Sequence, residues 1–234
     1  NSEVNWEAKD AFKTMRFWSN TTSVAVIAAT ATAFWFHLKS VMVDYSIDSG
    51  LVHVIYPILA VSGFIGRIWS GRLIDTFEEN GYLVLVIGLL LQVVAMVLIP
   101  TMAIHEGFLV LICILQGFAS SFVQNTSSVV FANFFGRAHL AEIQGRVDAF
   151  GVLGSAIGPF PFGFVRDLTG SFNSAFMVGA IFPLCCAILV YYEGRKFAEE
   201  HYDIHIKLTQ YEHVTTNDLS AEEEDPHEFE MVDV

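Results

Sequence analysis

The sequence predicts an all-α membrane protein whose chain crosses the bilayer six times. Of its 234 residues, 53% are hydrophobic and only 16% are charged, and the mean hydropathy is +0.50. An ordinary soluble domain carries more charge and fewer apolar residues. The apolar residues recur in six separate runs, and crossing the hydrocarbon core takes about 20 residues for each helix. Because the connections between the runs are short, successive helices are expected to be antiparallel neighbours.

The runs follow one another through most of the chain. Residues 1–16 are polar and carry Trp6, Phe12 and Met15 on one helical stripe, which is typical of an interfacial lead-in. The six spans are expected at residues 17–38, 51–73, 82–100, 108–131, 143–165 and 172–192. We therefore predict three parts: the lead-in at 1–16, a six-helix transmembrane part at 17–193 and a tail at 194–234.

The net charge of −13 is concentrated in the tail. Residues 194–234 hold twelve acidic side chains against Arg195, Lys196 and Lys207, which accounts for −9 of the total. A segment that ends in E-E-E-D-P-H-E-F-E cannot bury enough apolar surface to fold by itself. We expect it to be a disordered tail.

The basic residues predict the orientation of the chain, because cytoplasmic loops hold the excess of Lys and Arg. Only Lys39 and Arg166 lie on one side of the predicted membrane. The other side carries Lys9, Lys13, Arg16, Arg67, Arg72, Arg137, Arg146, Arg195 and Lys196. Both ends of this segment are therefore expected to be cytoplasmic. We expect the plasma membrane to hold the protein, with an organelle membrane as the alternative.

Several classes of function are excluded because their sequence motifs are absent. The sequence has no H-E-x-x-H, no G-x-S-x-G and no phosphate-binding glycine loop, so we predict that the chain is not an enzyme. The few basic residues lie at the predicted membrane boundary, which argues against binding of nucleic acid. His201 and His205 are four residues apart but lack a third ligand, so no metal or cofactor is predicted. Its three cysteines fall in apolar runs and are expected to be core residues.

The stretch from Ser62 to Gly81 carries an apolar run into a loop dense with charge. Gly63 and Gly66 are expected to let a neighbouring helix approach closely, as small residues do inside bilayers. Arg67 lies about 24 Å along its predicted span, roughly 6 Å inside the cytoplasmic edge. It either snorkels to the interface or, sharing the small-residue face with Gly71, points inward to bind substrate or act in gating.

The fourth span carries polar side chains at helical spacing. One face holds Gln116, Ser120, Gln124 and Ser127 or Ser128. The opposite stripe is expected to face lipid and consists of Leu111, Leu115, Phe118, Phe122 and Val129. Gln116 would lie about 13 Å into the span, near the bilayer centre. Such a polar face either makes hydrogen bonds between helices or lines a wet cavity.

The fifth span opens with Arg146 and Asp148, both of which suit a helix start at a cytoplasmic boundary. It continues as G-V-L-G-S-A-I-G-P-F-P-F-G. A helix so rich in Gly and Pro is expected to be kinked, and Gly154, Gly158 and Pro159 are expected to pack closely against a neighbour.

Three runs, in this order, resemble the major facilitator superfamily. G71-R-L-I-D75 resembles the G-x-L-x-D core of the loop motif between the second and third helices of each six-helix half. The runs F134-F-G-R-A-H-L-A-E-I-Q-G145 and R166-D-L-T-G-S-F172 resemble the junctions of the tenth, eleventh and twelfth helices, and are closest to the oxalate/formate antiporter and monocarboxylate transporter branch. The resemblance covers residues 11–192. It implies that the six helices are the C-terminal half of a twelve-helix fold and that residues 1–16 are a central-loop remnant.

The resemblance also implies a function. The chain would belong to a secondary transporter that moves a small organic anion, expected to be a monocarboxylate, by alternating access. Its partners would be this small-molecule solute, the lipid bilayer and the missing N-terminal half. Arg67 matches the membrane arginine that contacts the carboxylate in that branch, and Gln116, Ser120, Gln124 and Asn125 would line the cavity with it. The residues expected at the cytoplasmic gate are Gly71, Arg72, Asp75, Arg137, Arg146 and Asp148.

The sequence departs from the branch at two points. Gly63 stands where monocarboxylate transporters carry an aspartate, four residues before the arginine, and the fifth span lacks the lysine of the oxalate antiporter. The coupling ion therefore stays open. Two other functions also stay open: transport of a neutral solute such as an amino acid or sugar, and a non-transporting receptor or scaffold that signals through the acidic tail.

Overall fold

The computed structural model describes residues 6–77 and 80–200, and these form helices and connections without a strand. Six helical spans in this part are long and apolar enough to cross a membrane, which confirms the predicted all-α, six-span class. They are Met15–Asp44, Ser49–Phe77, Tyr82–Ala103, Gly107–Phe135, Leu140–Thr169 and Phe172–Glu200. The spans outrun the predicted ones by a few residues, because a helix can continue past the apolar run that marks its membrane segment.

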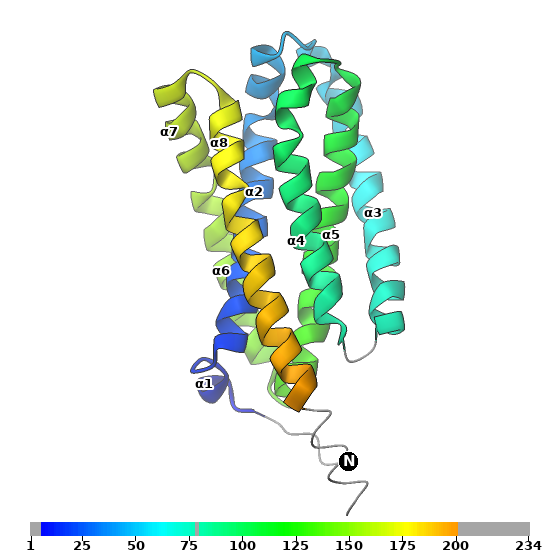
Figure 1. Ribbon diagram of the computed structural model, residues 1–234, viewed down its shortest axis with the longest axis vertical. Coiled ribbons are helices and arrows are strands. Elements are labelled where there is room, and N and C mark those ends of the chain that lie inside the picture. Colours follow the sequence, from blue (N-terminus) through cyan, green and yellow to red (C-terminus); the bar gives the residue numbers. More distant parts are fainter. Residues whose placement is uncertain (1–5, 78–79, 201–234) are drawn as a thin grey trace, which may run out of the picture. The chain divides into compact units, whose positions relative to one another are not determined.

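The spans are built from the helices labelled in Figure 1. A short helix α1 (Ala8–Ala11) precedes α2 (Met15–Asp44), and the turn η1 (Ser49–Leu51) leads into α3 (Val52–Phe77). Next, α4 (Tyr82–Val97) passes into η3 (Ile99–Ala103) and is followed by α5 (Gly107–Phe135). The fifth span is α6 (Leu140–Ile157) plus α7 (Pro159–Thr169), and the sixth begins with α8 (Phe172–Gly179) and continues as helix to residue 200.

The chain divides into a compact unit that ends at Arg195 and a second that starts at Lys196. Of the predicted tail at 194–234, residues 194–200 are helical, and the remainder lies outside the described residues.

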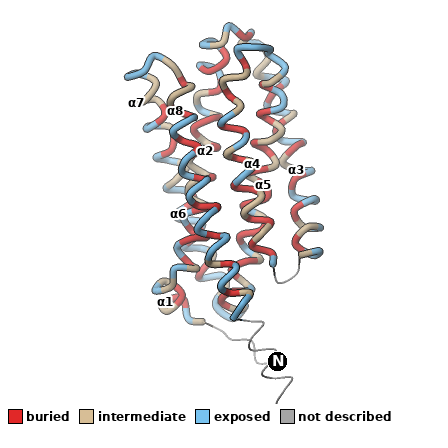
Figure 2. The backbone as a smooth tube through the Cα atoms, viewed as in Figure 1, coloured by how far each residue is buried: buried red, intermediate tan, exposed pale blue. Residues whose placement is uncertain are grey.

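Within this unit, α2 and α5 are the central helices. α5 packs against α3, α4 and α2, and α2 packs in turn against α6 and α7 (Figure 1). The outer spans are the least covered by other helices. In Ser49–Phe77 and in Leu140–Thr169, 22% of the residues in an apolar stretch of 18 residues are buried, against 44–50% in the other four spans. Long exposed stretches along α3 and α6 are visible in Figure 2. We call the end with the start of α2 and the end of α3 the lower end, as in Figure 1, and the opposite one the upper end.

Glycines set how closely two helix pairs approach. A Cβ atom built on Gly117 of α5 would lie 2.9 Å from the backbone nitrogen of Gly63 in α3. A Cβ on Gly158 would lie 2.6 Å from the Cα of Ala29 in α2. Atoms this close leave no room for a side chain, so the backbones of α3 and α5, and of α2 and the fifth span, are in direct contact. Inside a bilayer such packing is a main source of helix association, because lipid tails are as apolar as the side chains.

The fifth span is broken at Gly158, between α6 and α7. Pro159 and Pro161 have no backbone N–H, so each removes one hydrogen bond of the helix ladder at this point. His37 of α2 contacts the fifth span at this break: its Nε2 lies 3.0 Å from the carbonyl oxygen of Pro159. A carbonyl can only accept, so this ring nitrogen carries a proton. The break thus coincides with a cross-link to α2.

Candidate functional site

Helix α3 places Arg67 beside the packed face of the helix but outside it. The buried residues of α3 are Ile55, Leu59, Ser62, Gly66, Ser70 and Ile74, at the three- and four-residue spacing of one helix face. Arg67 follows Gly66 and is therefore turned by about 100° from it. Its side chain is exposed, and its guanidinium makes no ion pair or hydrogen bond with the residues that the structure describes. It lies ten residues, or about 15 Å, from the lower end of α3.

The polar residues of α5 do not share one exposed face. Gln124 is exposed, whereas Ser120 and Asn125 are half-buried. Gln116 is 0% exposed, and neither atom of its amide has a hydrogen-bond partner among the described residues. The expectation that it lines a cavity together with Gln124 needs correction, because α5 is covered by α2, α3 and α4. A polar stripe on a central helix can therefore face the interior of the helix bundle.

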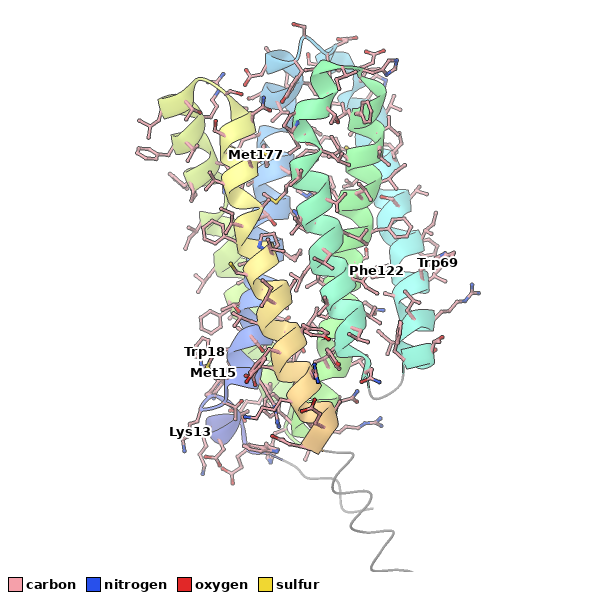
Figure 3. All side chains as sticks on the ribbon, in the orientation of Figure 1. Lys13, Met15, Trp18, Trp69, Phe122 and Met177 are labelled. Atoms are coloured by element: carbon pink, nitrogen blue, oxygen red, sulfur yellow. The ribbon has the colours of Figure 1, made fainter. Side chains whose placement is uncertain are left out.

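A similar correction applies to the apolar stripe of α5. Phe122 is only 4% exposed and packs with Ile74 of α3 and Val84 of α4, so it does not face lipid (Figure 3). Gly88 of α4 makes room for it, since a Cβ there would lie 2.8 Å from the Cβ of Phe122. The predicted lipid-facing stripe was wrong at this position.

Asn125 is joined to the turn of α3 that carries Arg67. Its Nδ2 donates to Ser70 Oγ at 2.9 Å and lies 3.4 Å from the carbonyl oxygen of Arg67. The hydroxyl of Ser70 in turn donates to the same carbonyl at 3.0 Å. Ser70 was not among the predicted site residues, although its spacing from Gly63 and Gly66 places it on the small-residue face.

The expected gate residues lie on the two outer spans and in the loop after α5. On α3, Arg72 and Asp75 are exposed, and Gly71 faces the amide of Asn125. Arg137, which is also exposed, follows Gly136, which has a positive φ at the end of α5.

On α6, Arg146 is paired with Glu142 at 2.7 Å and lies 4.3 Å above the ring of Phe12. The carboxylate of Asp148 accepts a hydrogen bond from Gln144. Among the described residues, the α3 and α6 groups form no ion pairs with one another. The structure does not bring the predicted gate residues together.

Two aromatic residues connect α2 and α3 above Arg67. The rings of Trp35 and Tyr56 stack at 5.9 Å with an interplanar angle of 10°, and the Tyr56 hydroxyl lies 3.4 Å from the Trp35 carbonyl. Tyr56 precedes Arg67 by eleven residues, about three helical turns, and so projects from the same side of α3. This pair was not predicted, because nothing in either span indicates which helices become neighbours.

Polar contacts also tie α2 to the last two spans at the upper end. Arg166 pairs with Asp44 at 3.2 Å, and the hydroxyl of Tyr45 donates to Asn173. Burial raises the pKa of Tyr45 above its ordinary value; its hydrogen bond with Asn173 offsets part of this rise, and the charge of Asp44 adds to it. This cluster fastens the upper end well away from Arg67.

Two surface grooves in the described part of the chain are not lined by Arg67. One of about 350 Å³ lies between α3 and α5, around Pro57 and Phe118, and another of about 330 Å³ lies at the α6–α7 break. Both are lined almost wholly by apolar side chains. No group of three or more His, Cys, Asp or Glu residues that could hold a metal occurs in the described part of the chain. His201 and His205 lie outside it.

The comparisons with known proteins agree with the helical architecture. The family model described as Major Facilitator Superfamily matches residues 19–210, which is more than half of the chain. A search of curated proteins finds no match.

Proposed function

This chain belongs to the major facilitator superfamily of membrane transporters, and from this premise we propose that it moves a small organic anion, with a monocarboxylate as the first candidate. Transport would proceed by alternating access, in which two six-helix halves rock around a central site. The six helices described here would be the C-terminal half, closest to the oxalate/formate antiporter and monocarboxylate transporter branch.

The proposal rests on the observation that Arg67 lacks an acidic partner among the described residues. A charged side chain is costly inside a membrane and is as a rule paired or functional. Arg67 has no acidic partner among the described residues, although the length of its span predicts that it lies roughly 6 Å inside the cytoplasmic edge. Its guanidinium presents planar, parallel N–H donors that match the two oxygens of a carboxylate. An anionic substrate would supply the charge that the protein leaves unpaired.

The surroundings of Arg67 support a site shared with a second half. Gln124 adds an exposed amide on the neighbouring helix, and the hydroxyl of the half-buried Ser120 has no hydrogen-bond partner among the described residues. Large apolar side chains also remain exposed on the outer spans: Phe64, Trp69, Val152, Ile157, Phe160 and Phe164. We propose that lipid covers part of this surface and that an N-terminal six-helix half covers the rest.

The lower end would hold the gate. Gly71, Arg72 and Asp75 end α3 there, and Arg137, Arg146 and Asp148 lie around the start of α6. The first of these groups forms no ion pair with the second in the described residues, and we propose that residues of another half complete the gate. We propose that this end faces the cytoplasm, as the excess of Lys and Arg predicts.

The test is solute flux through the full-length protein in liposomes. We expect uptake of labelled lactate, formate or oxalate, competition among these anions, and loss of uptake in Arg67→Gln. The variant Arg67→Lys keeps the charge but loses the planar fork, so it should retain only part of the activity. Lys39→Gln, which removes an exposed cation near the upper end of α2, is the matched control and should transport normally.

The outcomes separate the alternatives. If the protein takes up an amino acid or sugar, and Arg67→Gln leaves this uptake unchanged, then the substrate is a neutral solute and not an anion. Binding without accumulation of any solute would favour a receptor or scaffold. Comparing uptake with and without a pH gradient shows whether protons are coupled to the flux.

A further inference from the structure

We propose that Asn125 and Ser70 are positioning residues that hold the backbone turn from which Arg67 projects. The proposal rests on the anion-binding role of Arg67 and assigns Asn125 to the support of that residue instead of direct contact with the solute. The Arg67 guanidinium has no described partner, so its own side chain does nothing to fix its place. Its orientation must come from the backbone.

The hydrogen bonds at this turn form a closed arrangement. Asn125 Nδ2 donates to Ser70 Oγ at 2.9 Å, and Ser70 Oγ donates to the Arg67 carbonyl oxygen at 3.0 Å. The same Nδ2 lies 3.4 Å from that carbonyl. Because a carbonyl oxygen can only accept, the amide of Asn125 must present its NH2 group here. Ser70, which is 0% exposed, thus has both its donor and its acceptor function used.

A second contact one turn higher repeats the pattern. Ser121 Oγ, four residues before Asn125 on α5, donates to the carbonyl oxygen of Gly63 at 2.7 Å. Gly63 in turn precedes Arg67 by four residues on α3. Residues four apart lie on the same helix face, so two successive turns of α5 hold two successive turns of α3 through backbone carbonyls. Contacts to the backbone fix both the rotation and the height of α3 beside α5.

The glycines make this arrangement sterically feasible. A Cβ on Gly66 would lie 3.1 Å from the Cα of Phe118, and one on Gly71 would lie 4.0 Å from Asn125 Nδ2. Short side chains such as Ser and Asn reach a carbonyl on another helix only when the two backbones are this close. The small residues of α3 therefore serve a purpose beyond packing, since they bring α5 within hydrogen-bonding reach of the Arg67 turn.

A binding residue that is displaced by about 1 Å loses much of its effect. Removing the Asn125 or Ser70 bonds should therefore weaken anion binding while Arg67 itself stays intact. One hydrogen bond of ordinary net strength corresponds to a change of about threefold to tenfold in an equilibrium constant. We expect Asn125→Ala and Ser70→Ala to raise KM for the transported carboxylate by this factor, with little change in the maximal rate.

The deciding experiment reads the position of residue 67 without relying on transport. Arg67→Cys is introduced into the full-length protein together with Cys185→Ser, which removes the exposed cysteine of the described residues. The rate at which a small neutral alkylating reagent modifies the cysteine at position 67 is then measured in liposomes, before and after adding Asn125→Ala, Asn125→Asp or Ser70→Ala. The control is Thr126→Val, which removes a fully buried hydroxyl without a described partner from the adjacent position.

We expect the three test changes to alter the labelling rate at least threefold and Thr126→Val to leave it unchanged. Asn125→Asp matters most, because aspartate keeps the shape of asparagine but cannot donate to the Arg67 carbonyl. An unchanged rate in Asn125→Asp and Ser70→Ala would overturn the proposal, as would an equal effect of Thr126→Val. If the unmodified protein moves no carboxylate but the labelling changes as expected, the anion function fails while the positioning of residue 67 stands.

Discussion

His37 and Pro159 are joined across the break in the fifth span, with the Nε2 of His37 3.0 Å from the Pro159 carbonyl oxygen. The ring of His37 also lies 4.9 Å from that of Phe172, at the start of α8. One side chain of α2 thus contacts both the interrupted helix and the helix that follows it. The backbone discontinuity is held in place by a specific donor on a neighbouring span.

Replacing His37 should therefore loosen the upper part of the fifth span. In His37→Phe the ring contact survives but the donor is lost, and one hydrogen bond contributes a net of about 1 kcal/mol. For a chain of this size that corresponds to a drop of about 2–4 °C in the midpoint of thermal unfolding, measured on detergent-solubilised protein. His37→Gln keeps an N–H donor of similar reach and should lose less; equal midpoints for both variants would contradict the role of the hydrogen bond.

Larger residues at the crossing of α2 and the fifth span should be strongly destabilising. A Cβ on Gly154 would lie 3.1 Å from the Cα of Ala25, and the approach of Gly158 to Ala29 is closer still. Gly158→Leu forces the backbones apart, at a cost of about 1–3 kcal/mol or more. Gly145→Ala in the same helix is the matched control, because a Cβ there meets nothing within 4 Å. The thermal unfolding midpoint of Gly145→Ala should stay the same or rise, since alanine in a helix is more favourable than glycine by about 1 kcal/mol.

Gln116 should tolerate an apolar replacement of similar size. Its amide is buried without a described partner, and leaving a polar group unpaired costs about 1–3 kcal/mol. Gln116→Met should thus keep or raise the unfolding midpoint and leave solute flux intact. Gln92→Met is the informative comparison, because Gln92 Nε2 donates to Thr30 Oγ1 at 3.1 Å and that bond would be lost. A large loss of flux in Gln116→Met with normal stability would restore Gln116 to the solute site.

Tyr45 should introduce a dependence of stability on alkaline pH. Burial raises the pKa of its hydroxyl above 10.0 in the folded protein, so the folded state holds this proton more tightly than the unfolded state does. The resulting stabilisation is complete below the unfolded pKa and is lost as the pH rises through the folded pKa. The advantage of the unmodified protein over Tyr45→Phe in thermal unfolding should therefore shrink above about pH 10. A difference between the two unfolding midpoints that stays constant from pH 8 to pH 11 would argue against a raised pKa of Tyr45 in the folded protein.

Much of the architecture could be predicted from single-helix properties. Whether a segment crosses a membrane depends on its own length and hydropathy, and all six spans met that condition in the sequence. The break of the fifth span was likewise expected near Gly158 and Pro159, because proline lacks the N–H that the helix ladder needs. The motifs after the second span and around the fifth and sixth led to the superfamily that the family model then matched.

The candidate site depended on how helices meet, and here local patterns were insufficient. Gln116 and Gln124 lie on neighbouring parts of one polar stripe, but the packing of the other helices on α5 buries the first and leaves the second exposed. Phe122 looked lipid-facing for the same reason, because the sequence does not say which side of a helix its neighbours cover. The importance of Ser70 emerged only when Asn125 was found beside it.

The sequence by itself therefore determined the class, the number of spans, the interrupted helix and the presence of an arginine within the second span, since each follows from properties of one segment. Only the tertiary structure decided which polar groups are buried, which remain free and which hold the Arg67 turn. These are properties of pairs of helices, and they depend on backbone approaches of a few ångströms that small residues permit and that a single helix cannot reveal.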